Sequence, residues 1–413
     1  MFKNIEYPWG MAIPLPSSLS DVITDGILAQ AGVDRAFAAQ LGRINGVEFN
    51  LDQTPDTDSP RTVSVRINRA EGRPFDTSGT VVAWVREGEF TWVSDRGGQF
   101  NIPELTGTHP HSDDLIQAAR TLHGNAPAFI APFADRGQAL VVLNINPELT
   151  EVRSELIAGL ATLPPGIDAQ RALASYAGFR GLGIQRGRSH TALSDGTTVI
   201  WRAGRPYEVS GGLSLQDVRA DSAFSSAEHQ LLFDALSPTH QVTYSPESGT
   251  ALIDGQHRVT ALPLATIESG QWRWAWSDNR VPGHVTTGLR RFGVDNGLLP
   301  LVTPVLPVED AGELNLISVA KPVLQCWTNV TVDSGAGFHI VLLLEHPRLH
   351  LPPATHAAIE ATLYSPLDAG IDARRAVSAY AAQRQVPFDG ATITVDEQQV
   401  TVEFSGNQIR SIS

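Results

Sequence analysis

The feature that most constrains this chain is an internal repeat. The segments 166–177 (GIDAQRALASYA) and 370–381 (GIDARRAVSAYA) agree at eight of their twelve positions. Three more pairs of similar segments follow in the same order: SLSDV at 18–22 with SLQDV at 214–218, GEFTW at 88–92 with GQWRW at 270–274, and VVLNINPEL at 141–149 with VLLLEHPRL at 341–349. A period this long indicates tandem domains rather than a solenoid of short repeats. We therefore expect a tandem duplication.

The distance between matching segments changes along the chain, from 196 to 182, 200 and 204 residues. Such drift indicates insertions, which belong in surface loops. We place them near 52–62 and 71–79 in the first repeat and near 306–315 in the second. Two adjacent glycines, Gly211 and Gly212, favour a join near 209–216. The expected organisation is an N-terminal arm over 1–17, a first domain over 18–211 and a second domain over 212–413.

Each repeat has the pattern of an α+β domain, with an antiparallel β-meander, packed helices and a closing β-hairpin. Asp254-Gly255 and Asp195-Gly196 each lie between β-rich flanks and predict hairpin turns. In the second repeat, apolar residues at helical spacing predict a helix over 226–236 that Ser226 caps. The residues of this apolar face are Leu231, Leu232, Ala235 and Leu236.

The repeated segment itself predicts a helix that an aspartate caps. Asp168 and Asp372 stand at its start in the two copies. Both are candidates for catalytic carboxylates, but an aspartate in this position is far more often an N-cap. In the second copy, within a helix over 371–384, we expect small residues to pack on a sheet and three arginines to point to water: Arg374, Arg375 and Arg384.

Charge and composition exclude several classes of function. The chain has 30 basic and 44 acidic residues and a net charge of −14, which argues against a broad nucleic-acid-binding face. The single cysteine, Cys326, excludes an intrachain disulfide. The first residues lack the pattern of a secretory signal, and the longest aliphatic run, 340–344, is too short to cross a bilayer. We expect a cytoplasmic protein without membrane or nucleic-acid partners.

A tryptophan-rich segment at 270–279, GQWRWAWSDN, is the most distinctive motif. It resembles the Trp-x-Trp-Ala-Trp-x-Asn strand of a bacterial family of small α+β domains of unknown function, although Asn279 is displaced here by one position. The resemblance covers about 222–345. It implies an α+β fold and a bacterial, cytoplasmic setting, and no activity.

The same segment offers a candidate binding surface. On a strand, Trp272, Trp274 and Trp276 would share one face. That face is either core or an aromatic platform for a ligand, and core is favoured for the first two tryptophans. The first repeat has Phe90, Trp92 and Ser94 at the corresponding positions. The candidate ligand or partner surface comprises Trp276, Arg273, Asp278 and Asn279.

No known catalytic motif is present: the sequence lacks a Gly-x-Ser-x-Gly elbow, a Walker loop, His-Glu-x-x-His and paired cysteines. His109 and His111, followed by Asp113 and Asp114, are weak candidates for a metal site. The alternative, that Ser112 starts a helix with acids in its first turn, is favoured. We interpret a second group of histidines as part of a solvated loop and Cys326 as a buried packing residue. The spacing of one group of aspartates is too irregular for a calcium-binding loop. The histidines are His339, His346, His350 and His356, and the acids are Asp52, Asp56 and Asp58.

Two functional classes remain. The favoured one is a non-catalytic binding or scaffolding protein without a cofactor, which binds another protein or a small ligand through its two related domains. Immunity or chaperone activity towards a partner protein would be a form of it. The alternative is an enzyme with a site in the cleft between the repeats.

Overall fold

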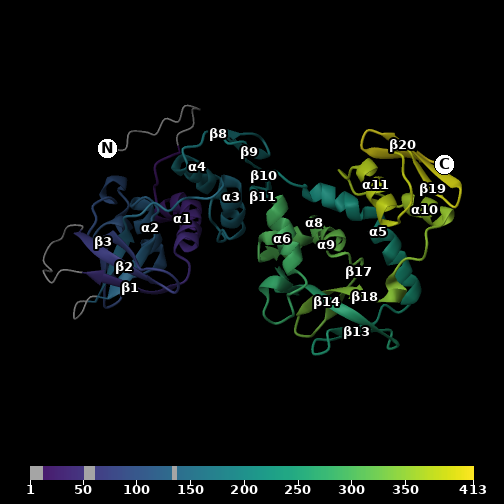
Figure 1. Ribbon diagram of the computed structural model, residues 1–413, viewed down its shortest axis with the longest axis horizontal. Coiled ribbons are helices and arrows are strands. Elements are labelled where there is room, and N and C mark those ends of the chain that lie inside the picture. The colour runs from purple at the N-terminus through teal and green to yellow at the C-terminus, as the bar shows by residue number, and fades with distance from the viewer. Residues whose placement is uncertain (1–12, 51–60, 133–136) are drawn as a thin grey trace. The chain divides into compact units, whose positions relative to one another are not determined.

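The computed structural model describes residues 13–50, 61–132 and 137–413, which form two compact units (Figure 1). Unit 1 ends at Val209 and unit 2 begins at Ser210. Helices and antiparallel sheets occur in both, so the expected α+β class is confirmed. Most of the arm expected over 1–17 and of the insertion near 52–62 lies outside the described residues, as do Asp52, Asp56 and Asp58.

Over its described residues, unit 1 contains a long first helix, a branched sheet, three further helices and a second sheet. Its helices are α1 (Leu19–Leu41), α2 (Asp113–Leu122), α3 (Val152–Ala161) and α4 (Ala169–Phe179). Its first sheet contains β1 (Ile44–Asn50), β2 (Arg61–Arg69), β3 (Phe75–Arg86), β4 (Glu89–Trp92), β5 (Thr108–Pro110), β6 (Ala128–Pro132) and β7 (Gln138–Leu143). Its second sheet contains β8 (Ile184–Arg186), β9 (His190–Leu193), β10 (Thr198–Arg202) and β11 (Arg205–Val209).

Unit 2 also begins with a long helix and continues with a branched sheet. Its helices are α5 (Leu215–Leu236), α6 (Thr287–Asn296), α7 (Leu299–Val302), α8 (Val308–Glu313), α9 (Leu316–Leu324), α10 (His356–Leu363) and α11 (Ala373–Gln383). Its first sheet contains β12 (Val242–Ser245), β13 (Thr250–Ile253), β14 (His257–Glu268), β15 (Gln271–Trp274), β16 (Val305–Pro307), β17 (Thr328–Asp333) and β18 (His339–Glu345). Its second sheet contains β19 (Thr392–Val395), β20 (Gln398–Ser405) and β21 (Gln408–Ile412).

The branch in each first sheet is made by one long strand. In unit 1, β3 pairs with β2 and β4 in succession on one edge and with β7 on the other, and its register to β7 shifts between Val81 and Ala83. In unit 2, β14 pairs in the same way with β13, β15 and β18, with a shift between Pro263 and Ala265. Proline lacks a backbone N–H group, so a bulge is one of the few places where a paired strand tolerates it.

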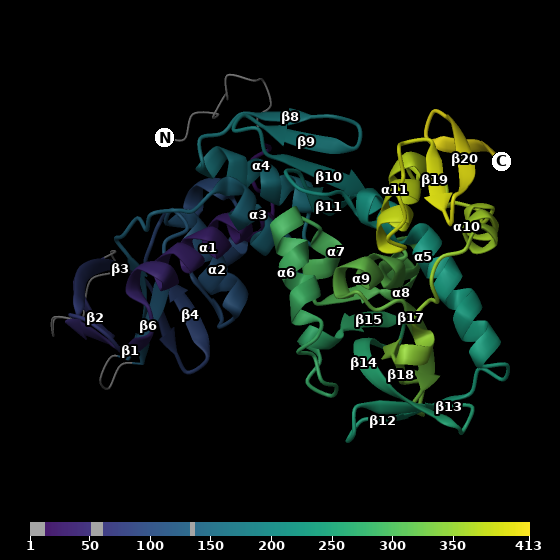
Figure 2. The same cartoon turned by 45° about the vertical axis from the view of Figure 1, so that its right-hand side comes forward.

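Helix α5 differs from its expected form. It begins at Leu215, eleven residues before Ser226, after a capping box in which Ser214 and Asp217 bond reciprocally, so Ser226 is not its N-cap. Leu231 was expected to face the core and is 62% exposed, while Phe233 is buried. In unit 2, α5 contacts α11, α9 and β17 (Figure 2).

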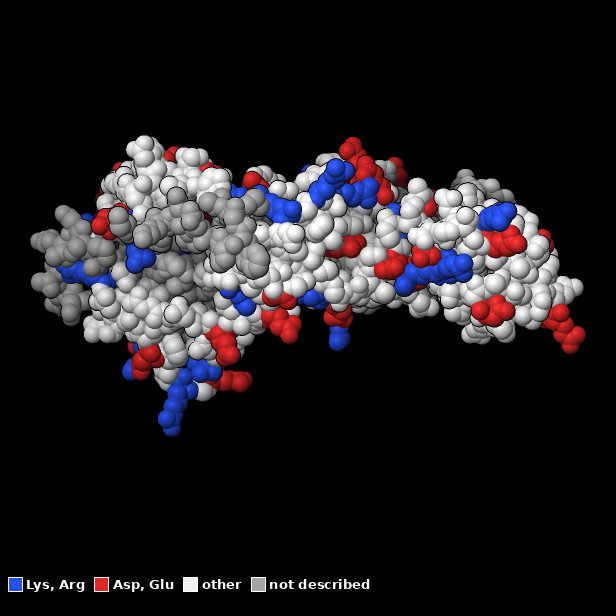
Figure 3. Space-filling view, turned by 90° about the horizontal axis from the view of Figure 1, so that it is seen from above, with Lys and Arg blue, Asp and Glu red and all other residues white. Residues whose placement is uncertain are grey.

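Most of the local signals in the sequence hold. Asp168 and Asp372 accept hydrogen bonds from the first backbone N–H groups of α4 and α11, which confirms that they are caps. The hairpins expected at Asp195-Gly196 and Asp254-Gly255 are present. On the face shown in Figure 3, basic side chains are interspersed with acidic ones. Within the described ranges, none of the helices has the length and apolar character needed to cross a bilayer.

Candidate functional site

The tryptophan segment is mainly core. Trp272 is 3% exposed, Trp274 is fully buried, and their rings meet edge to face at 5.3 Å. Trp274 Nε1 donates a hydrogen bond of 2.8 Å to the carbonyl oxygen of Pro300. Strand β15 ends at Trp274, and Trp276 lies in a single 3-10 turn over Ala275–Ser277. The expectation that all three tryptophans share one strand face is therefore wrong for Trp276.

The four residues of the candidate surface lie in different environments. Asp278 is buried: it accepts a hydrogen bond of 2.6 Å from Thr266 and pairs with Arg280 at 2.7 Å. The hydrogen bonds from Arg280 hold the pKa of Asp278 well below its usual range. Trp276 is half-buried beneath the guanidinium group of Arg290, at 4.8 Å from the ring centroid. Arg273 is half-buried and Asn279 is exposed, and their role as a binding surface stays a prediction.

In unit 1 the corresponding strand, β4, carries different aromatic residues. Phe90 and Trp92 meet edge to face at 5.0 Å, and Trp92 Nε1 donates to the carbonyl oxygen of Glu104 at 2.9 Å. The buried Ser94 is hydrogen-bonded to His123 at 2.9 Å. Burial lowers the pKa of His123 to about 4, so the ring is neutral near neutral pH.

The weak metal candidates lie apart from any group of ligands. His109 Nε2 is hydrogen-bonded to the carbonyl oxygen of Thr106 at 2.7 Å, and His111 stacks on Phe90 at 6.3 Å. Ser112 accepts a hydrogen bond from the backbone N–H of Leu115, which confirms that it caps α2. Among the residues that the structure describes, no cluster of three His, Cys, Asp or Glu side chains has the arrangement of a metal site.

A polar cavity of about 460 Å³ lies within unit 2. This volume falls in the range of small-molecule sites. Its walls come from α5, the end of α11, strands β17 and β18 and the turn that follows β18. The lining residues are Ser225, His229, Gln325, Trp327, Thr328, Leu344, Glu345, Leu349, His350, Leu351, Gln383, Arg384 and Gln385.

Two histidines line this cavity in different states. His229 stacks on Trp327 at 5.7 Å, and its Nδ1 lies 3.1 Å from the carbonyl oxygen of Leu349. Because a carbonyl oxygen only accepts, Nδ1 carries the proton and Nε2 keeps a lone pair. Burial lowers the pKa of His229 to about 4. His350, on the more exposed side, bonds through Nε2 to Glu345 at 2.5 Å.

The side chain of Arg384 is buried beside the cavity, and not all of its N–H donors form hydrogen bonds. Its side chain is 7% exposed, and its Nη1 donates to the carbonyl oxygen of Pro352 at 2.9 Å. Nε lies 3.3 Å from a carboxylate oxygen of Glu228, which also accepts a hydrogen bond of 2.8 Å from Tyr380. Neither Nε nor Nη2 of Arg384 has a hydrogen-bond partner of good geometry.

Lys321 lies behind this lining, on α9. The residue is 4% exposed, and its ammonium group has no hydrogen bond or ion pair with any described residue. Burial lowers its pKa to about 8. Cys326, two residues after the end of α9, is also buried, and burial raises the pKa of its thiol to about 12. The thiol is therefore protonated at neutral pH and inert, as its interpretation as packing implies.

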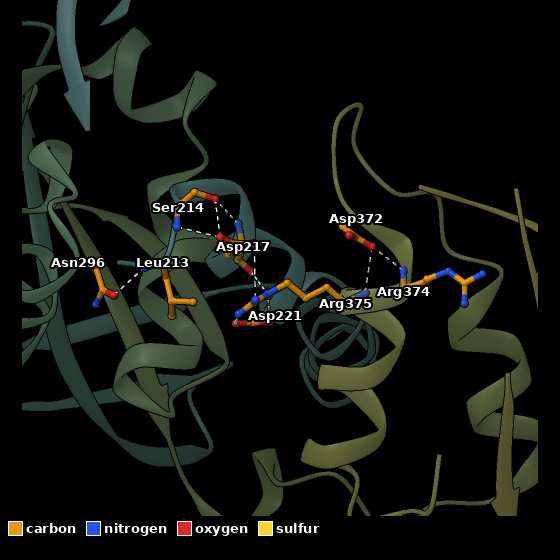
Figure 4. A network of polar contacts seen from close by, with 8 residues as sticks. All are labelled: Leu213, Ser214, Asp217, Asp221, Asn296, Asp372, Arg374 and Arg375. Carbon is orange, nitrogen blue, oxygen red and sulfur yellow. Dashed lines mark hydrogen bonds and ion pairs between the residues drawn. The ribbon is translucent and has the colours of Figure 1, made fainter. Parts of the chain in front are cut away.

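The position of α11, which carries Arg384 at its end, is fixed by a network at the start of α5. Arg375 pairs with Asp221 at 2.7 Å and with Asp217 at 3.6 Å, and Asp217 also belongs to the capping box with Ser214 (Figure 4). Unit 1 has the same arrangement on α1 and α4. There, Arg171 lies 2.7 Å from Asp25 and 3.9 Å from Asp21. These ion pairs hold the two helices of each unit together.

The sequence interpretation missed most of the cavity. His350 was assigned to a solvated loop, and its side chain is 62% exposed, but it also lines the cavity. Arg384 was expected to point to water and is almost completely buried. Arg375 was also expected to be solvated and is ion-paired instead. One signal was available: Lys321 stands in the apolar run LISVAKPVL, where a solvated lysine is out of place.

Comparison with known proteins gives one family. The model of a family of unknown function (DUF6882) matches residues 216–347, about a third of the chain. The match confirms that this segment is a domain of unknown function. It includes His229, Trp327 and Glu345 and ends before His350 and Arg384. No curated protein matches the chain, and no solved structure matches it.

Proposed function

We propose that this protein is a ligand-binding protein built from two duplicated α+β units, and that unit 2 holds a small polar molecule in its cavity. The observation that carries the proposal is the cavity itself: about 460 Å³, with histidine, arginine, glutamine and tryptophan side chains converging on it. Sites for small molecules combine such a volume with a few directed polar groups.

A comparison of matching positions in the two units supports the proposal that the polar lining of the cavity serves to bind a ligand. At an offset of 196 residues, Ser225 and His229 correspond to Ala29 and Val33, which are buried in α1. At an offset of 204, Gln383 corresponds to Phe179. A unit of this design thus folds with apolar residues at these positions. In unit 2, Ser225 donates to Gln383, and His229 Nδ1 donates to the carbonyl oxygen of Leu349. His229 Nε2 keeps a lone pair that a ligand can use, which the valine of unit 1 does not offer, and this difference supports ligand recognition.

The chemistry of the lining favours binding over catalysis. The one thiol nearby is protonated, and the hydroxyl of Ser225 donates to Gln383 rather than to a base. A second candidate function, general acid–base catalysis, is favoured by one observation: the neutral His229 and the His350–Glu345 pair line the same cavity. Turnover of a bound ligand would distinguish the two. The cytoplasmic and bacterial setting expected from the sequence remains part of the proposal.

A fragment screen by NMR tests the proposed site, with the indole N–H of Trp327 as the reporter. We expect fragments that shift this resonance to lose binding in His229→Val, which introduces the residue found at the matching position of unit 1. Asn279→Ala serves as the matched control and should bind normally. Fragments that instead shift Trp276 and respond to Asn279→Ala would place the site at the tryptophan segment and refute the cavity.

A further inference from the structure

We infer that the ligand of the unit 2 cavity carries an anionic group, a carboxylate or a phosphate, which Arg384 contacts and Lys321 attracts from behind the lining. This inference rests on the proposed function and names the class of ligand. It starts from a buried positive charge that has lost its partner.

The comparison with unit 1 identifies the missing partner. Arg120 and Lys321 lie on α2 and α9, the helices that precede β6 and β17 and contact α1 and α5 in their units. At the ends of both helices the carbonyl oxygen of the cationic residue accepts the N–H of the residue five positions later, at 2.7 and 3.2 Å, so we match the two positions. Arg120 is neutralised by Asp34 through two hydrogen bonds, of 3.0 and 2.5 Å. The position that corresponds to Asp34 at an offset of 196 is Gln230. Unit 2 therefore keeps the cation and lacks the carboxylate.

The other charges around the cavity leave this one uncompensated. Glu228 is engaged by Arg384 and Tyr380, and Glu345 by His350. Besides burial, the positive charges of Lys321 and Arg384, and that of His350, lower the pKa of His229. These groups therefore lie close enough to His229 to act on the same region of the cavity.

Arg384 supplies the donors that an anion needs. It lines the cavity, and its side chain is more than nine-tenths buried. Nε has only the 3.3 Å ion pair with Glu228, and Nη2 has no hydrogen-bond partner among the described residues. Buried donors are almost always bonded, so the unused Nη2 at a cavity indicates an acceptor that is supplied from outside the chain. A planar guanidinium group matches a carboxylate or a phosphate. An anion there would use these donors and would also relieve the unpaired charge of Lys321.

The test uses the full chain and three probes of similar size: benzoate, phenyl phosphate and the neutral benzamide. Binding is followed by calorimetry and by Trp327 fluorescence. At neutral pH we expect at least one of the two anions to bind about tenfold tighter than benzamide, because benzamide can also accept from Arg384 but carries no charge for Lys321 to attract. A preference for benzoate would indicate a carboxylate ligand, and a preference for phenyl phosphate would indicate a phosphate.

The critical variant is Lys321→Met, which removes the charge and keeps the length of the side chain. Replacing an uncompensated buried charge by an apolar group should not harm folding. We expect the variant to lose most of the preference for anions and to bind benzamide like the parent. Lys3→Met, which removes the only other lysine, is the control for net charge and should keep the preference.

The possible failures are distinguishable. If benzamide binds in the cavity as tightly as both anions, or if Lys321→Met keeps the preference, the cavity remains a binding site and the anion inference is wrong. If no probe binds, the anion inference is also wrong. The proposed function then fails only if the fragment screen leaves the Trp327 resonance unshifted.

Discussion

A buried glutamate that binds a tyrosine and an arginine lies on α3 in unit 1 and on α5 in unit 2, and mutation can test whether the two positions are interchangeable. In unit 1, Glu155 of α3 accepts hydrogen bonds from Tyr176 at 2.5 Å and Arg180 at 2.6 Å. In unit 2 the equivalent tyrosine and arginine bind Glu228, which lies on α5 instead. The offsets of 204 and 196 residues match Glu155 with Ile359 and Glu228 with Gly32. At these two matched positions, each unit thus has one glutamate and one residue that is small or apolar.

The geometry of Gly32 shows why the exchange is feasible. A Cβ atom at Gly32 would lie 3.0 Å from the carboxylate oxygen Oε2 of Glu155. A glutamate at position 32 therefore starts beside the place where the present carboxylate lies. With Glu155 in place, the two side chains would collide and repel each other, so Gly32→Glu alone should destabilise unit 1.

Glu155→Ile alone should be severely destabilising. Glu155 is 2% exposed, and its loss leaves Arg180 and the Tyr176 hydroxyl group without their acceptor. Breaking a buried ion pair by removal of one partner costs about 3–5 kcal/mol. The double variant, Gly32→Glu with Glu155→Ile, copies unit 2. We expect it to be more stable than the sum of the single effects by at least about 2 kcal/mol, at the upper part of the range for coupled neighbours.

Hydrogen exchange of the full chain, read by mass spectrometry on peptides from α1 and α4, measures the stability of this region separately from unit 2. Gly32→Gln with Glu155→Ile is the matched control, because its amide fills the space without the charge that Arg180 needs. Additivity of the two single effects within about 0.5 kcal/mol would refute the exchange of roles and with it this support for the duplication.

Three further outcomes follow from the side chains of unit 2. Trp274→Ala should lower the free energy of unfolding by roughly 3–5 kcal/mol, and Trp276→Ala by much less, as measured by urea unfolding; a Trp274 variant that unfolds like the parent would contradict the core assignment. Because the folded pKa of Lys321, about 8, lies below its ordinary value of 10.5, the unfolded chain binds more protons between these pH values. Lys321→Met should therefore exceed the parent in stability by up to about 3 kcal/mol below pH 8. Urea titrations at rising pH should show this advantage decline, and a constant advantage would contradict the shifted pKa. Gln230→Asp should restore a counter-ion and weaken anion binding in calorimetry, and unchanged affinity would show that position 230 does not face the lysine.

The sequence predicted those parts of the fold that depend on local rules. The hairpins at Asp195-Gly196 and Asp254-Gly255 and the caps at Asp168 and Asp372 each require only a few adjacent residues. The start of α5 was missed because its first half lacks a clear apolar period. This half is instead tied to α11 by Arg375 and Asp221, residues 154 positions apart.

The cavity could not be predicted from the sequence, because its residues also come together through contacts between distant positions. His229 meets the carbonyl oxygen of Leu349 across 120 positions of the chain, and Arg384 reaches Glu228. Motif searches depend on fixed spacing, and no fixed spacing joins these residues. The motif with the clearest spacing, the tryptophan segment, is explained mainly by packing of Trp272 and Trp274.

Helix α5 contributes to two hydrophobic cores of unit 2. Phe224, in its first half, packs with the residues of α10, α11 and β19–β20, and Phe233, near its end, packs with those of β13, β14 and β18. Ser225 and His229, which line the cavity, lie between these two anchors. One continuous helix thus joins the two cores, and the cavity lies between them. A ligand bound there stabilises the folded arrangement of both anchors, so it should make the two parts of unit 2 unfold together.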